Sequence, residues 1–146
     1  MISVIVPVYN EENAVLGVLD DIRKVLAGFL PYEIIVVDDG SSDQTLVRVR
    51  SYEGMNLKII EHPENLGYGK SLYDGIQAAA YDCIAIIDGD GSYPAASLKV
   101  LYGYYPKYDM IVGARQGQEY RKGLFKRLAR VLFQYLAEYA TGRSIP

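Results

Sequence analysis

Two aspartates one residue apart are the strongest candidate for chemistry in this 146-residue sequence. Asp88 and Asp90 flank Gly89 at the end of an apolar segment, and Gly91 and Ser92 follow. Carboxylate oxygens are the ligands that hard divalent cations such as Mg²⁺ take from proteins, commonly together with water and substrate phosphate oxygens. A plain surface turn has the same composition, because Asp and Gly are ordinary turn formers. The pair is therefore a candidate metal site that other residues have to support.

A second acidic segment, residues 38–43, also follows an apolar run. Ser42 and Asp43 are explained by capping of the next helix, because short polar side chains accept the free N–H groups of a first turn. Capping does not explain Asp38, which is the last residue of the run itself. A carboxylate in that position suits a ligand's N–H or hydroxyl group, so Asp38 is a candidate binding residue.

Two more polar segments, 7–12 and 65–71, stand where an apolar run ends or a helical pattern begins. In the first, Tyr9 offers an aromatic face for a base, and Glu11 can cap a helix or reach a ligand. In the second, Lys70 lies near backbone N–H groups of a helix start that could bind phosphate. A single Gly-x-Gly is often only a turn, so the second segment gains weight only from the others.

The elements that must position these residues alternate along the chain. Short apolar runs rich in β-branched residues predict strands covered on both faces, and the stretches between them have helical spacing. This alternation predicts an α/β fold with a mainly parallel sheet, helices on both faces and ligands at the carboxyl ends of the strands. The predicted strands are Ile2–Val8, Glu33–Asp38, Leu57–Ile60, Cys83–Asp88 and Met110–Val112, and the helical patterns run from Val15 to Phe29, Leu46 to Val49, Leu72 to Ala80 and Leu98 to Leu101.

Charge divides the chain. Residues 1–114 hold 8 Lys and Arg against 16 Asp and Glu, whereas residues 115–146 hold 7 against 2. Residues 119–141 predict one amphipathic helix with a basic face. Such a helix can lie at a membrane interface, dock on a part of the protein outside this sequence, or pack on the core with a solvated charged face, and packing is the commonest case. The basic side chains of this predicted helix include Arg121, Lys122, Lys126, Arg127 and Arg130.

Several classes of function lack their signatures. The single cysteine, Cys83, excludes a disulfide framework and fits a reducing, cytoplasmic compartment. The single histidine, His62, leaves no Ser-His-Asp set and no histidine-rich metal site. The dinucleotide and P-loop glycine motifs are missing, and no apolar run reaches the roughly 18 residues of a membrane span. No nucleic-acid partner is expected, because the acidic body would repel phosphates.

Four segments in order carry a resemblance: SVIVPVYNEE, EIIVVDDGSSDQT, NLGYGKSL and IAIIDGDGSYP. Over residues 2–115 the chain resembles family-2 glycosyltransferases with the Rossmann-like GT-A nucleotide-sugar-binding fold. With its basic segment after Val112–Arg115 it is most similar to the branch of dolichol-phosphate mannose synthase and the bacterial polyprenyl-phosphate glycosyltransferases. The resemblance implies a donor-binding domain at 1–115, a basic segment at 116–146 that begins the acceptor and membrane-facing part, and truncation on the acceptor side.

The resemblance also implies roles for individual residues. A nucleotide sugar is bound by residues from all four segments, and Asp88 and Asp90 form an Asp-x-Asp motif for Mg²⁺ or Mn²⁺. The polyprenyl-phosphate branch often has a glutamine close to this motif, and here Ser92 stands two residues after Asp90 as the third candidate metal ligand. The candidate nucleotide-sugar-binding residues are Pro7, Tyr9, Glu11, Asp38, Lys70 and Asp88.

The reaction implied is inverting, metal-dependent transfer of a sugar from a UDP- or GDP-linked donor to a polyprenyl (dolichyl or undecaprenyl) phosphate. The resemblance implies that Asp90 and Arg115 are catalytic residues. The residues that would bind the acceptor phosphate are Arg115, Lys126, Arg127 and Arg130. A phosphate acceptor with a second pKa of about 6 is mainly a dianion and needs cations in place of a general base. The helix at 119–141 would hold the enzyme at the cytoplasmic face of a membrane.

Three points stay open at this stage. The first alternative is a glycosyltransferase acting on a hydroxyl acceptor in polysaccharide or surface-glycan synthesis, which would need a general base. The second is a non-catalytic nucleotide-sugar-binding or interaction module, in which the helix at 119–141 serves a partner. A homo-oligomer is also compatible with the sequence.

Overall fold

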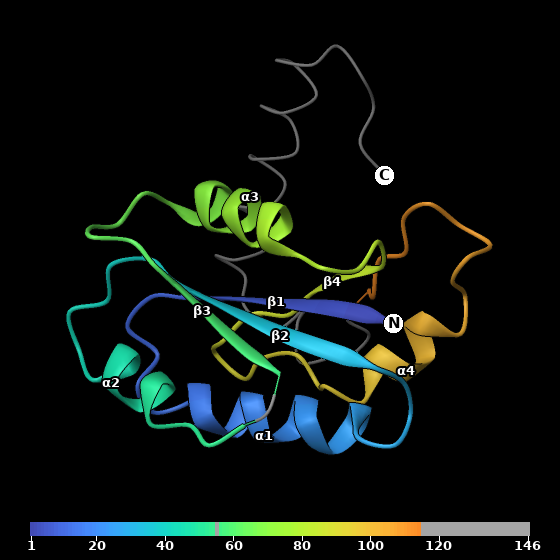
Figure 1. Ribbon diagram of the computed structural model, residues 1–146, viewed down its shortest axis with the longest axis horizontal. Coiled ribbons are helices and arrows are strands. Elements are labelled where there is room, and N and C mark those ends of the chain that lie inside the picture. Colours follow the sequence, from blue (N-terminus) through green and yellow to red (C-terminus); the bar gives the residue numbers. More distant parts are fainter. Residues whose placement is uncertain (55, 115–146) are drawn as a thin grey trace, which may run out of the picture. The chain divides into compact units, whose positions relative to one another are not determined.

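The computed structural model describes residues 1–54 and 56–114, and Met1–Ile111 form a compact unit (Figure 1). Strands and helices alternate in this unit. All strand pairs are parallel, and the order across the sheet is β3-β2-β1-β4. The elements are β1 (Ile2–Val8), α1 (Val15–Leu26), β2 (Tyr32–Asp38), α2 (Thr45–Arg50), β3 (Leu57–Glu61), α3 (Tyr68–Ala78), β4 (Ile84–Ile86) and α4 (Ser97–Tyr102).

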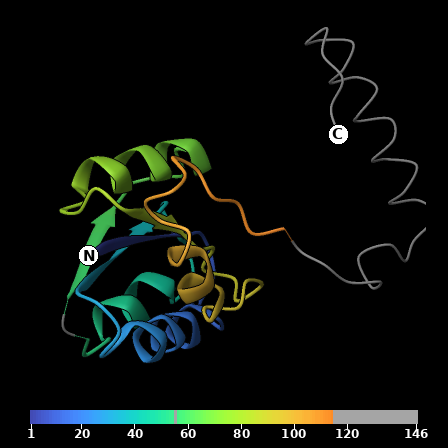
Figure 2. The same cartoon turned by 90° about the vertical axis from the view of Figure 1, so that its right-hand side faces the viewer.

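Helices cover both faces of the sheet, as the alternation predicts. Figure 1 shows α3 on one side of the strands and α1, α2 and α4 on the other, and Figure 2 shows the same two layers from the end. Successive strand side chains point to opposite faces. Thus Val4 and Val6 of β1 belong to the core with α1, while Ile5 lies in the smaller core under α3.

Register brings the ends of the strands to one edge. Val8, the last residue of β1, pairs with Asp38, the last residue of β2, and Asp38 pairs with Glu61 at the end of β3. Ile5 pairs with Ile86, so the chain beyond β4 continues alongside the last residues of β1. Because the strands are parallel, the loops after β1, β2 and β4 meet at the same edge, where ligands bind in open α/β sheets.

The structure corrects the predicted boundaries at two places. Residues 110–114 form no strand: they pair with no strand of the described residues, and Met110 is 80% and Val112 72% exposed. Helix α1 ends at Leu26 and not near Phe29, because Gly28 adopts a left-handed conformation with φ of 72°.

Two further expectations differ or fall elsewhere. β4 is shorter than the apolar run Cys83–Asp88, and Ile84 and Ile86 are 38% and 46% exposed, so this strand is not covered on both faces within the described residues. The predicted helix at 119–141 lies outside the described residues, as does the predicted domain boundary after residue 115. Among the helices of residues 1–54 and 56–114, none has the length and apolar character needed to cross a membrane.

Candidate functional site

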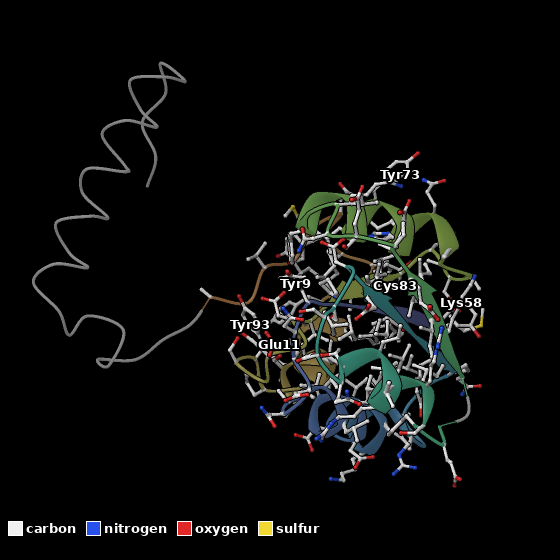
Figure 3. The ribbon with its side chains drawn as sticks, turned by 90° about the vertical axis from the view of Figure 1, so that its left-hand side faces the viewer. Tyr9, Glu11, Lys58, Tyr73, Cys83 and Tyr93 are labelled. Carbon is white, nitrogen blue, oxygen red and sulfur yellow. The ribbon has the colours of Figure 1, made fainter. Side chains whose placement is uncertain are left out.

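A pocket of about 340 Å³ opens at the carboxyl edge of the sheet. It combines the end of β1, the residue after β2, the start of α3 and the turn after β4. Figure 3 shows the Tyr9 and Glu11 side chains lying on the same side of the unit. The lining residues are Pro7, Val8, Tyr9, Glu11, Asp39, Asn65, Tyr68, Ser71, Asp88, Gly89 and Asp90.

The loop after β1 is fixed to the loop after β2 through Asn10. Asn10 has a positive φ of 57°, a conformation that asparagine tolerates better than most residues. Its side-chain Oδ1 accepts hydrogen bonds from the Ser42 N–H at 2.8 Å and the Ser42 hydroxyl at 3.2 Å, and its own N–H donates to the Ser41 hydroxyl at 3.0 Å. These bonds hold the backbone that presents Tyr9 and Glu11.

A second set of bonds joins the same two loops one turn further on. The Glu11 N–H donates to the Thr45 hydroxyl at 2.7 Å, and the Glu12 N–H donates to Asp43 Oδ2 at 3.2 Å. In return, the Gln44 N–H donates to Glu12 Oε2 at 3.0 Å. Asp43 Oδ1 also accepts the Thr45 N–H at 2.9 Å, so this carboxylate serves the first residue of α2 as well as the loop contact. The two loops are therefore joined by hydrogen bonds along their length.

The consecutive aspartates at the end of β2 have different environments. Asp38 is 1% exposed, and its Oδ2 accepts the Ser41 N–H at 3.1 Å. Its Oδ1 is buried and has no hydrogen-bond partner among the described residues. A buried acceptor without a donor is costly, and a water or a ligand group can satisfy it. Asp38 is not among the residues that line the pocket.

Asp39 lines the pocket and was not singled out from the sequence. It accepts hydrogen bonds from the backbone N–H groups of Leu66 and Gly67, both at 2.9 Å, and Nδ1 of His62 lies 2.7 Å from its Oδ1. Burial alone would raise the pKa of Asp39, but these donors outweigh it and hold the pKa below its ordinary value. The sequence signal that could have identified Asp39 is the alternation of side chains along a strand, because it places the side chains of Asp38 and Asp39 on opposite faces.

The candidate metal ligands lie on the turn after β4. A Cβ at Gly89 would collide with Val8, so only glycine lets this turn pack against the end of β1. Asp88 Oδ1 accepts the Tyr68 hydroxyl at 3.1 Å across the pocket, and Asp90 Oδ1 accepts the Ser92 N–H at 2.8 Å. Burial, the charge of Asp88 and its hydrogen bond together raise the pKa of Tyr68 to about 12, so this hydroxyl stays a donor at neutral pH.

Carboxylates crowd this part of the pocket. Burial raises the pKa of Glu11 above its ordinary value, and the charges of Asp90 and Asp43 raise it further. Among the described lining residues there is no lysine or arginine. Oxygen donors and negative charge fit a hard divalent cation. No group of three or more His, Cys, Asp or Glu side chains within the described residues forms a ready metal cage, so a cation here would take two carboxylates and fill its other positions with water and ligand oxygens.

The structure brings some predicted site residues together and leaves others apart. Pro7, Tyr9, Glu11, Asp88 and Asp90 share the pocket. Lys70 lies outside its lining, and its Nζ is 2.6 Å from Asp74 Oδ2. Ser92 is exposed and also lies outside the lining. Residues outside the described part are Arg115, Lys126, Arg127 and Arg130, so their roles stay predictions.

A four-stranded parallel sheet with helices on both faces and a carboxylate-lined pocket at its carboxyl edge defines an open α/β protein, a class that binds ligands at this edge. Comparison with known sequences is more specific: residues 3–145 match the Glycosyl transferase family 2, and the chain belongs to this family.

Two curated relatives show the kind of protein that the chain resembles. The dodecaprenyl-phosphate galacturonate synthase of Rhizobium johnstonii is 34% identical over 97% of this chain and 42% of its own length. The undecaprenyl-phosphate 4-deoxy-4-formamido-L-arabinose transferase of Pectobacterium carotovorum is 32% identical over 99% of this chain and 45% of its own length. The chain thus spans less than half the length of the curated relatives it matches.

Among solved structures, the mannosyltransferase PcManGT of Pyrobaculum calidifontis, in complex with GDP-Man and Mn²⁺, is similar with a TM-score of 0.63. It is 26% identical, and the match covers 75% of this chain and 33% of the other. The resemblance to family-2 glycosyltransferases and the predicted α/β fold are thereby confirmed.

Proposed function

We propose that this chain is the donor-binding part of a metal-dependent glycosyltransferase that moves a sugar from a UDP- or GDP-linked donor to a polyprenyl phosphate. The observation that carries the proposal is a pocket that combines an aromatic and acidic loop after β1 with the Asp88–Asp90 turn after β4. A nucleoside diphosphate has a base at one end and a charged diphosphate at the other. The loop after β1 suits the base, and the Asp88–Asp90 turn with a bound cation suits the diphosphate.

The nucleoside side of the proposal rests on rigid groups. Tyr9 and Pro7 offer flat surfaces for a base or ribose, and the hydrogen bonds through Asn10 hold them in place. Asp38 Oδ1, which has no hydrogen-bond partner among the described residues, would accept an N–H or hydroxyl of the nucleoside. Such preformed loops lower the entropy cost of binding.

The diphosphate of the donor would be bound through Mg²⁺ or Mn²⁺, which Asp88 and Asp90 would hold. When bound, the cation neutralises charge that develops on the leaving diphosphate. Tyr68 donates to Asp88 and so orients one of the two carboxylates. Ser92, the third predicted ligand, is nearby through its N–H bond to Asp90. The inverting outcome predicted from the resemblance places the acceptor on the face of the sugar opposite the diphosphate.

The acceptor side of the proposal rests on the curated relatives, whose names include polyprenyl phosphates, and on the basic residues 115–146. A phosphate dianion attacks without a general base, so arginine and lysine side chains are the groups it requires. Arg115, with Lys126, Arg127 and Arg130, would bind it, and the segment 119–141 would rest on an anionic membrane surface at the cytoplasmic face.

A transfer assay tests the proposal. Radiolabelled UDP-glucose or GDP-mannose is incubated with the purified protein, Mn²⁺ and either undecaprenyl phosphate or undecaprenol in detergent. The expected result is label in the lipid phosphate only. The label is lost with EDTA and in Asp90→Ala but kept in Glu61→Gln, which alters an exposed side chain outside the lining.

Two other results would contradict parts of the proposal. Transfer to undecaprenol but not to its phosphate would assign a hydroxyl acceptor. Donor binding without transfer to either lipid, by a protein that extends over the length of its relatives, would indicate a non-catalytic module.

A further inference from the structure

Behind the pocket wall, four charged side chains form a chain of contacts that the proposed reaction does not use. Nδ1 of His62 lies 2.7 Å from Asp39 Oδ1, and Nε2 lies 3.0 Å from Asp74 Oδ2. Asp74 in turn pairs with Nζ of Lys70. The His62 and Asp39 side chains are only 5% and 6% exposed. The cluster connects the end of β2, the segment after β3 and the first turns of α3.

The proton positions follow from the partners. An ionised carboxylate only accepts hydrogen bonds, so a histidine between two carboxylates makes both bonds only when both ring nitrogens carry protons. The hydrogen bond from Lys70, followed by that from His62, lowers the pKa of Asp74 in spite of burial, and donors to Asp39 lower its pKa as well. With both ring nitrogens protonated, His62 together with Lys70 would balance the charges of the two carboxylates.

The cluster reaches the pocket through Asp39. Its two oxygens accept the Leu66 and Gly67 N–H groups, which stand directly before the first residue of α3, Tyr68. Asn65 and Tyr68, on either side of these amides, line the pocket. A tilt of the Asp39 carboxylate would therefore displace both lining residues.

The backbone of residues 62–67 is closely packed against the loop after β2. The His62 N–H donates to the Asp38 carbonyl at 2.8 Å, and a Cβ at Gly40, which has a φ of 70°, would collide with the backbone of Glu64 and Asn65. The segment 62–67 thus packs against the loop after β2. Its side-chain bonds are the two made by His62, and its backbone bonds are those of the His62 N–H to the Asp38 carbonyl and of the Leu66 and Gly67 N–H groups to Asp39.

We propose that His62 is a positioning residue for donor binding: held as an imidazolium between Asp39 and Asp74, it orients the Asp39 carboxylate and thereby fixes residues 65–68 in the wall of the pocket. The inference rests on the proposed function, because the wall it fixes is that of the donor pocket. His62 touches no ligand in this account and acts through Asp39.

The main test compares His62→Gln with Glu61→Gln. The shorter reach of a glutamine amide lets it bond one carboxylate but not both, whereas Glu61 is the adjacent residue and pairs with Arg50 at the surface. In His62→Gln, amide hydrogen exchange at Leu66 and Gly67 should accelerate at least tenfold while amides of β1 and α1 keep their rates. Affinity for UDP-glucose or GDP-mannose with Mn²⁺, measured by calorimetry, should fall about tenfold. Glu61→Gln should change neither.

A double-mutant cycle separates positioning from general stability. In the Asp39→Asn background, His62→Gln should change donor affinity less than twofold, because the group through which His62 acts has gone. Asp74→Asn keeps the histidine but removes the negative charge of its outer partner, together with the ion pair to Lys70, so it should show the same changes with about a threefold loss. This variant keeps the test available if His62→Gln does not fold.

A measurement on the unaltered protein completes the design. Nitrogen NMR of the only histidine should show both ring nitrogens protonated at pH 7. One unprotonated nitrogen, or unchanged Leu66 and Gly67 exchange in His62→Gln, overturns the inference. If the unaltered protein binds neither donor, the proposed function fails, and the exchange and NMR results still decide the role of His62.

Discussion

The contact between α3 and the sheet depends on a glycine, and a pair of matched substitutions measures it. Gly75 lies inside α3, where an added Cβ would come 2.5 Å from Cγ2 of Ile5 and 3.3 Å from Cγ2 of Val37. Both are methyl groups of branched side chains that are buried in β1 and β2, so they have little room to move away. Gly17 lies in α1 and has nothing within 4 Å of an added Cβ. Gly17→Ala and Gly75→Ala therefore make the same chemical change in open and in closed surroundings.

The magnitude follows from two opposing effects. Alanine stabilises a helix by roughly 0.5–1 kcal/mol over glycine, and this gain is common to both variants. Extra methyl groups in a packed core cost roughly 1–3 kcal/mol, and this cost falls on Gly75→Ala only. Gly17→Ala should stabilise the protein, while Gly75→Ala should be neutral to destabilising by up to about 2.5 kcal/mol.

Urea unfolding followed by circular dichroism measures both free energies. The difference between the variants, roughly 1–3 kcal/mol, corresponds to about 4–12 °C in Tm for a unit of this size. Equal stabilisation by the two alanines would refute the close packing of α3 on β1 and β2. Because α3 contributes Tyr68 and Ser71 to the pocket, that result would also remove the support for the pocket's geometry.

Three further predictions concern the loops and their charges. Asn10→Ala loses two bonds from Ser42 at a positive φ and should destabilise by roughly 2–3 kcal/mol, more than Asn10→Gly, in urea unfolding. The pKa of Asp39 is lowered on folding, so its stabilisation is present above about pH 4 and lost as pH falls further; unfolding at pH 2–7 should show this loss in the unaltered protein but not in Asp39→Asn. Removing the exposed ion pair by Arg50→Gln should cost less than about 1 kcal/mol, since solvent screens it.

The fold could be predicted from the sequence where local pattern and burial agree. The runs that form β1 and β2 are apolar on both faces because helices cover both, and the structure confirms them. The run at Met110–Val112 has the same local character but no neighbouring strand in the described part of the chain. A strand is stable only with a partner, and periodicity carries no information about partners.

The candidate site also contains residues that could be predicted from local sequence and residues that could not. Asp88 and Asp90 could be found because two carboxylates on a glycine turn are conspicuous within the sequence itself. Asp39 and His62 could not, because their roles depend on contacts 23 residues apart in the chain. The expectation that Lys70 meets phosphate stays a prediction, and its bond to Asp74, four residues along α3, offers a simpler role that helical spacing itself supplies.

The central claim is that the pocket binds a nucleoside-diphosphate sugar through a cation on Asp88 and Asp90. Calorimetric titration of UDP-glucose and GDP-mannose into the purified protein, with Mn²⁺ and then with EDTA, tests it most directly. The account predicts binding of one donor that weakens at least about 100-fold with EDTA or in Asp90→Ala and is unchanged in Gly17→Ala. Equal affinity with EDTA and in Asp90→Ala would contradict the account.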